Sequence, residues 1–124
     1  MPEISRGPGR LLVAVYAVFA LAATARSSVQ ITTKLSEAPV AYLLSAVAAV
    51  IYIVATVALA KEARRVALLA CGAELVGVLA VGAVSVLAPD AFPDATVWSG
   101  FGRGYGFVPL VLPIAGLWWL RRSR

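Results

Sequence analysis

Two long stretches of the chain consist almost entirely of apolar residues, and a shorter apolar stretch lies on each side of them. Residues 39–60 contain no formally charged side chain, and residues 66–87 contain one, Glu74. A helix needs about 20 mainly apolar residues to cross the ~30 Å hydrocarbon core of a bilayer, because it rises about 1.5 Å per residue. Both stretches are therefore predicted to be transmembrane helices.

The two outer stretches are less regular. The first reaches the length of a span only if its helix continues through Arg26, so we expect it over residues 11–31. The last, over residues 104–120, carries Pro109 and Pro113, and proline removes a backbone donor and bends a membrane helix. The pattern predicts an all-α membrane protein, a four-transmembrane-helix bundle in one domain whose last helix is proline-kinked.

The N-terminal stretch also has the composition of a secretory signal peptide. Arg6 and Arg10 precede its apolar run, and the small-residue triplet Ala23-Thr24-Ala25 follows it. Two interpretations follow from this pattern. The stretch is either a retained first span or a cleaved signal peptide, and cleavage would leave three spans with the same orientation.

Basic residues mark one side of the predicted membrane. The tails and the loop between the two central spans hold most of the 11 basic residues, namely Arg6, Arg10, Lys61, Arg64, Arg65, Arg121, Arg122 and Arg124. The other side holds Arg26, Lys34 and Arg103. Because Lys and Arg in short loops favour the cytoplasm, we expect a multi-pass protein of the plasma (inner) membrane with both termini cytoplasmic. We also expect this basic face to attract anionic lipids.

Composition supports a membrane protein and narrows the function classes. The chain is 61% hydrophobic and 14% charged, whereas soluble domains are roughly 45–50% apolar and about 25% charged. It has no histidine and one cysteine, which excludes imidazole metal sites, an intrachain disulfide and CxxC redox chemistry. We expect no enzyme, no cofactor and no metal site. Nucleic-acid binding is not expected either, because the basic residues form short membrane-proximal clusters with no folded domain to present them.

Glu74 is the residue with the strongest claim to chemistry. It lies about 12 Å from the inner end of its predicted helix. An unpaired ionisable group at that depth costs on the order of 2.5–3.5 kcal/mol and usually faces other helices or water. Tyr52 should lie level with Glu74, Thr56 and Tyr16 come next in depth, and Cys71 shares its helical stripe. We expect these five residues to form an intramembrane polar site with a Glu74–Tyr52 hydrogen bond.

Three roles fit such a glutamate: a hydrogen-bonded contact between helices, the coupling of transport to protons or cations, and a contact with a partner subunit. Small residues accompany it on the same helix. Ala73 and Gly77 are one turn apart, and Gly72 and Gly82 add further points of close approach. We therefore expect this helix to lie centrally in the bundle, packed closely against its neighbours.

Glycine alternates with large residues before the last helix. Because a period of two matches an extended chain, the pattern predicts that residues 98–107, if extended, form a ribbon with one bare face and one aromatic and basic face. Three interpretations remain for this segment: a flexible outer loop whose aromatic residues enter the interface, an outer lipid or ligand contact formed by Arg103, Trp98 and Tyr105, and a re-entrant segment that leads into the last helix. It is not a phosphate-binding loop, because it lacks the GxxxxGK pattern.

The remaining aromatic and acidic residues indicate membrane anchors and a helix end, and not a catalytic or metal site. Trp118 and Trp119 precede the terminal arginines, where an inner aromatic belt is expected, and Trp98 belongs to the corresponding outer cluster. Asp90 and Asp94 lie in repeated Pro-Asp-Ala units, which are more typical of a helix end than of a divalent cation site.

Four segments resemble those of small four-span integral membrane proteins of actinobacteria: residues 15–20 (VYAVFA), 92–100 (FPDATVWSG), 105–110 (YGFVPL) and 118–122 (WWLRR). The resemblance covers most of the chain and implies an origin, but it brings neither an activity nor functional residues. The size, the spans and the intramembrane glutamate also resemble small multidrug exporters. Those proteins carry their glutamate in the first helix, whereas Glu74 is in the third.

The sequence therefore leads to two functional hypotheses. The first is a non-enzymatic accessory or interaction subunit, which packs against a membrane-protein partner or a second copy of itself. The alternative is a small proton-coupled transporter or channel component that uses Glu74, with Tyr52 and Thr56 along its path.

Overall fold

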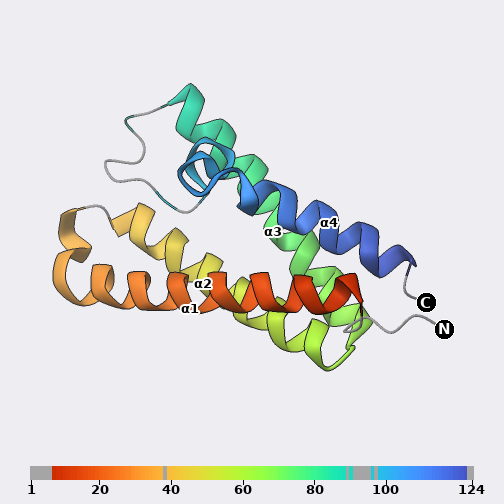
Figure 1. The fold of residues 1–124 in the computed structure, drawn as a ribbon. Helices are drawn as coiled ribbons and strands as arrows, with labels where there is room; N and C mark the ends of the chain where they lie inside the picture. The colour runs from red at the N-terminus through yellow and green to blue at the C-terminus, as the bar shows by residue number, and fades with distance from the viewer. Residues whose placement is uncertain (1–6, 38, 89, 91–95, 97, 123–124) are drawn as a thin grey trace.

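Every regular element that the computed structural model describes is a helix (Figure 1). The described residues are 7–37, 39–88, 90, 96 and 98–122. They form four α-helices and two short 3₁₀ segments, namely α1 (Pro8–Lys34), η1 (Leu35–Glu37), α2 (Pro39–Ala60), α3 (Arg64–Leu87), η3 (Ser99–Tyr105) and α4 (Val108–Arg122). An all-helical fold is the one expected in lipid, because a helix satisfies its backbone polar groups internally.

Three of these helices are long and apolar enough to cross a membrane, over Gly9–Thr33, Pro39–Ala60 and Arg64–Leu87. The first span lies within α1, which is one continuous helix of 27 residues that runs through Arg26. A cut after Ala25 would fall inside this helix. The fourth helix has 15 residues, so its length is about 22 Å.

The helices pack in chain order (Figure 1). α1 lies along α2, α2 packs on α3, and α3 packs on both α4 and η3. The start of α1, the turn between α2 and α3, and the end of α4 lie at the same end of the bundle. At that end the Arg64 guanidinium donates a hydrogen bond to the backbone carbonyl of Leu120, which joins the start of α3 to the end of α4.

Alanine makes close packing of α2 possible. Ala41, Ala48 and Ala55 recur every seventh residue, and all three are fully buried. Small side chains at an interface let two helix backbones approach closely, and this approach drives association where lipid removes the hydrophobic force. Large aliphatic residues of α2 instead face outward, among them Val47, Val50 and Val57.

The glycine-alternating segment is not the extended ribbon that its period predicts. Gly100, Phe101 and Gly102 all have positive φ, between 60° and 85°, and η3 is a tight left-handed coil there. Its large residues turn inward: Phe101 lies against Gly82 and Trp98 lies against Gly77 of α3. The glycines permit left-handed backbone and close approach, which sequence alternation alone does not distinguish from a strand.

Trp98 is not an exposed interfacial anchor, because only 2% of its surface is accessible. Trp118 is 54% exposed, as expected for a residue that faces lipid or an interface, whereas Trp119 is 9% exposed and belongs to the buried cluster. The two adjacent tryptophans therefore have different environments, since α4 turns one toward the bundle and the other away from it.

Candidate functional site

Glu74 lies inside the bundle and does not face lipid. Its accessible surface is 0%, as are those of Cys71 and Val78 one turn away on the same face of α3. The stripe that the sequence indicates is thus the buried face of this helix. A carboxyl group at such a position needs hydrogen-bond partners from neighbouring helices, because no water reaches it.

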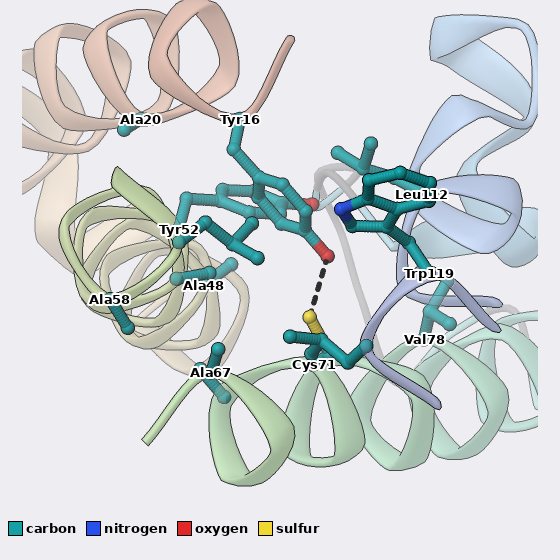
Figure 2. Close-up of a cluster of buried hydrophobic side chains, with 14 of the residues drawn as sticks. Tyr16, Ala20, Ala48, Tyr52, Ala58, Ala67, Cys71, Val78, Leu112 and Trp119 are labelled. Atoms are coloured by element: carbon teal, nitrogen blue, oxygen red, sulfur yellow. Dashed lines mark hydrogen bonds between the residues drawn. The ribbon is translucent and has the colours of Figure 1, made fainter. Parts of the chain in front are cut away.

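The partner of Glu74 is Tyr16 of α1. The Tyr16 hydroxyl donates to Glu74 Oε1 at 2.7 Å, and its oxygen lies 3.4 Å from Cys71 Sγ. A tyrosine hydroxyl has one hydrogen, so the Cys71 thiol is the donor in the second contact. Figure 2 shows Tyr16 reaching from α1 past Tyr52 toward Cys71 on α3. Three groups thereby form a short chain that links α1 to α3.

The expected hydrogen bond between Glu74 and Tyr52 is wrong. The Tyr52 hydroxyl instead accepts a hydrogen bond from the indole N–H of Trp98 at 3.1 Å. Tyr52 is fully buried, and its ring packs against those of Tyr16 and Phe19 at centroid distances of 6.2 and 5.7 Å. Depth along the helices is similar for Tyr16 and Tyr52, and depth alone could not decide which hydroxyl turns toward α3.

α4 closes the site from the remaining side. At Gly116, an added Cβ would lie 2.9 Å from Cys71 Sγ and 3.6 Å from the Tyr16 hydroxyl oxygen. A larger residue would therefore collide with the polar chain itself. Gly116 is not recognisable as a site residue from the sequence, because a lone glycine in an apolar helix has many explanations.

One oxygen of the glutamate has no partner among the described residues. Glu74 Oε2 is buried and makes no hydrogen bond within the part of the chain that the structure describes. A buried polar atom without a partner costs free energy of about 1–3 kcal/mol, more if it is charged. The site can therefore hold the helices together through Oε1 while Oε2 keeps an unused capacity to bond.

Other predicted site residues do not join this cluster. The Thr56 hydroxyl donates to the carbonyl of Tyr52 in its own helix at 2.7 Å. Tyr105 accepts a hydrogen bond from Arg26 of α1, whose guanidinium also lies 6.0 Å from the centre of the tyrosine ring. The outer contact expected from Arg103, Trp98 and Tyr105 is therefore divided: Arg103 is exposed, Trp98 is buried against α3, and Tyr105 pairs with α1.

Metal ligation has no support among the described residues, where no group of three potential ligand side chains comes together. Asp90 is exposed, and Asp94 lies outside the described residues. Cys71 is a free, buried thiol.

The opposite face of α3 is open. A groove of about 540 Å³, here called the α2–α3 groove, runs between these two helices. It is lined by Val47, Ile51, Leu68, Leu69, Gly72, Ala73, Val76, Gly77 and Trp98. An added Cβ at Gly72 would meet no atom within 4 Å. The groove is thus apolar and shallow at its small residues, where another helix could approach closely.

In comparisons with known proteins, no family model, no curated protein and no solved structure matches the chain.

Proposed function

We propose that the protein is a small, non-enzymatic accessory subunit of a membrane complex, inserted in the plasma membrane by four spans. The observation that carries this proposal is the α2–α3 groove. Gly72 faces open space and Ala73 is exposed, so two adjacent small residues lie on a surface whose other lining residues, apart from Gly77, have large apolar side chains. Membrane helices associate through such small-residue surfaces.

The fourth crossing is proposed to combine η3 with α4. α4 alone is too short for a ~30 Å core, at about 22 Å. Phe101 of η3 packs against Gly82 in the outer half of α3, and the chain continues from η3 into α4 through Phe107. This arrangement corresponds to a re-entrant segment that leads into a short helix. Pro113 lies within α4, where its missing donor favours a bend.

The orientation follows from charge. The start of α1, the turn between α2 and α3, and the end of α4 lie at the same end of the bundle (Figure 1), and they carry the basic residues Arg10, Lys61, Arg64, Arg65, Arg121 and Arg122. We infer that this end is cytoplasmic and contacts anionic lipids. An origin in actinobacteria is part of the same proposal and rests on the resemblance described above.

The geometry of Glu74 favours a structural role over a contact with another subunit. Its side chain is fully buried within its own chain and bonds to α1. It lines neither the α2–α3 groove nor any surface that a partner could reach in this arrangement. Glu74 therefore stabilises the bundle that presents the groove.

The test is association in native membranes. In a Cys71→Ala background, Ala73→Cys should crosslink to a neighbouring helix, and Gly72→Leu should abolish the crosslink by filling the groove. Ala14→Cys, on the exposed side of α1, is the matched control and should give no specific product. The mass of the product separates a second copy from another protein. Purification of an isolated monomer in mild detergent, together with no Ala73→Cys crosslink, contradicts the proposal.

One observation supports the alternative, a proton-coupled transporter or channel component: the unpartnered Oε2 of Glu74. This hypothesis requires Glu74 to exchange protons with an aqueous path. Reconstituted protein would then show a pH-dependent flux or substrate binding that Glu74→Gln removes. Thr32→Val, which changes an exposed hydroxyl that bonds only within α1, is the matched control.

A further inference from the structure

A second site lies in the outer half of the bundle, away from both Glu74 and the α2–α3 groove. It is a partly enclosed cavity of about 160 Å³ between α1, α2 and η3, here called the outer cavity. Its lining residues are Val18, Phe19, Ala22, Ala23, Arg26, Ser27, Ser45 and Tyr105. Ligand pockets for drug-sized molecules span roughly 300–1,000 Å³, so this cavity suits only part of one hydrocarbon chain.

The lining divides into an apolar part and a polar part along α1. Val18, Phe19 and Ala22 lie toward the middle of the helix, and Arg26 and Ser27 lie one to two turns further toward its outer end. An amphiphile that entered from the membrane would find apolar contacts at the depth of acyl chains. It would find hydrogen-bond donors nearer the headgroups.

Ser27 indicates that the polar part is incomplete as the chain stands. Its residue is 5% exposed, and its Oγ has no hydrogen-bond partner among the residues that the structure describes. Leaving a buried hydroxyl unsatisfied costs about 1–3 kcal/mol, so a bound group that supplied an oxygen would recover this loss. Ser27 is one of the residues that line the cavity, so a bound group would lie beside this residue.

Arg26 supplies a positive charge at the polar part of the cavity. Among the residues that the structure describes, its guanidinium bonds to the hydroxyl of Tyr105, a neutral group, and to no carboxylate. The side chain is exposed, and a positive charge at membrane depth usually has a functional partner. An arginine presents several donors in a planar fork, which suits the oxygens of a carboxylate or a phosphate.

We propose that the outer cavity binds an anionic amphiphile, with its carboxylate or phosphate oxygens at Arg26 and Ser27 and the first part of a hydrocarbon chain against Val18, Phe19 and Ala22. Two sources share this chemistry: a free fatty acid and an anionic phospholipid of the outer leaflet. This site does not depend on the α2–α3 groove. Its failure in a binding test would therefore leave the proposed subunit role intact.

The experiment is native mass spectrometry of the full chain in detergent, with oleate, dioleoylphosphatidylglycerol or dioleoylphosphatidylcholine added. The wild type should retain one anionic amphiphile at least tenfold better than phosphatidylcholine. Preference for oleate or for phosphatidylglycerol identifies the source. Equal retention of phosphatidylcholine overturns the proposal.

Four variants locate the site. Ala22→Phe should fill the cavity and remove retention, whereas Ala14→Phe, on the exposed surface of α1, should not. Arg26→Gln should remove the preference for an anion, and Arg103→Gln, at an exposed arginine outside the cavity, should leave it unchanged. Retention by Ala22→Phe at the wild-type level overturns the proposal, as does an unchanged anion preference in Arg26→Gln.

Two further variants separate binding from structure. Tyr105→Phe removes the Arg26–Tyr105 bond and keeps the guanidinium, so anion retention should be maintained or increased. If Tyr105→Phe instead loses the anion preference as Arg26→Gln does, the arginine serves only to join α1 to η3 and the proposal fails. Ser27→Ala should lower retention of the anion severalfold. If it raises the unfolding temperature with no change in retention, Ser27 has no part in binding.

Discussion

The two faces of α3 differ in what covers them. On one face, Cys71 and Glu74 are fully buried beneath α1 and α4, and each polar group lies within a few ångströms of Tyr16. On the other face, Gly72 and Ala73 open onto the α2–α3 groove with no side chain above Gly72. Polar residues on the buried face of α3 therefore stabilise the bundle. Small residues on its open face leave a surface on which another helix could pack.

The largest expected effect is the difference in stability between two glycine-to-leucine substitutions, one packed against the buried face of α3 and one on its open face. Gly116→Leu adds a side chain at a position where even a Cβ would lie only 2.9 Å from Cys71 Sγ, so it should destabilise the bundle by about 3 kcal/mol. Gly72→Leu fills open space and should leave stability within about 1 kcal/mol of the wild type. Thermal unfolding in detergent, followed by circular dichroism, measures both. Equal losses in the two variants would contradict the contrast between closed and open faces.

The second effect concerns the hydrogen bond that closes the buried face. Tyr16→Phe leaves Glu74 Oε1 without its donor, beside an Oε2 that already has none, and should cost about 2 kcal/mol of stability. Glu74→Leu in the same chain should recover most of the loss, because both members of the bond are then replaced by apolar groups. A double-mutant cycle by thermal unfolding measures the coupling. Simple additivity of the two changes would show that the bond contributes nothing.

The third effect tests which tyrosine donates a hydrogen bond to Glu74. Tyr52→Phe removes the acceptor of the Trp98 indole N–H and should cost about 1 kcal/mol. Since Tyr52 does not bond to Glu74, this cost should be the same in the wild-type and Glu74→Leu backgrounds, within about 0.5 kcal/mol. Unfolding followed by tryptophan fluorescence reports on the same contact. A strong coupling between Tyr52 and Glu74 would restore the pairing that depth along the helices predicts.

The helical class and the long apolar helices could be predicted because length and hydropathy are local properties of the chain. The predicted range 39–60 coincides with the bounds of α2, since Pro39 begins the helix and the charged residues Lys61 and Glu62 follow it. Glu74 could be recognised as a buried residue for the same reason, because a lone charge in an apolar helix must find a polar environment.

The partners of these residues could not be predicted, because they depend on how helices rotate about their axes. Tyr16 and Tyr52 differ little in depth, and only the packed bundle shows which one meets Glu74. The prediction for the segment before α4 was wrong for another reason. Alternating glycine is compatible with both extended and left-handed backbone, and the choice was made by contacts of Phe101 and Trp98 with glycines of α3.

The smallest effect sharpens the contrast at the open face. Gly72→Ala adds one methyl group that meets nothing within 4 Å, and alanine favours a helix over glycine by up to about 1 kcal/mol. The isolated chain should therefore become slightly more stable, by about 0.5 kcal/mol, while its crosslinking through Ala73→Cys becomes weaker. Unfolding in detergent and crosslinking in membranes give the two readouts. A gain in stability together with weaker crosslinking would show that Gly72 serves a helix packed against this face and not the stability of the isolated chain. If Gly72→Ala leaves crosslinking unchanged, the groove does not require a bare backbone, and close helix approach at this residue is not the basis of association.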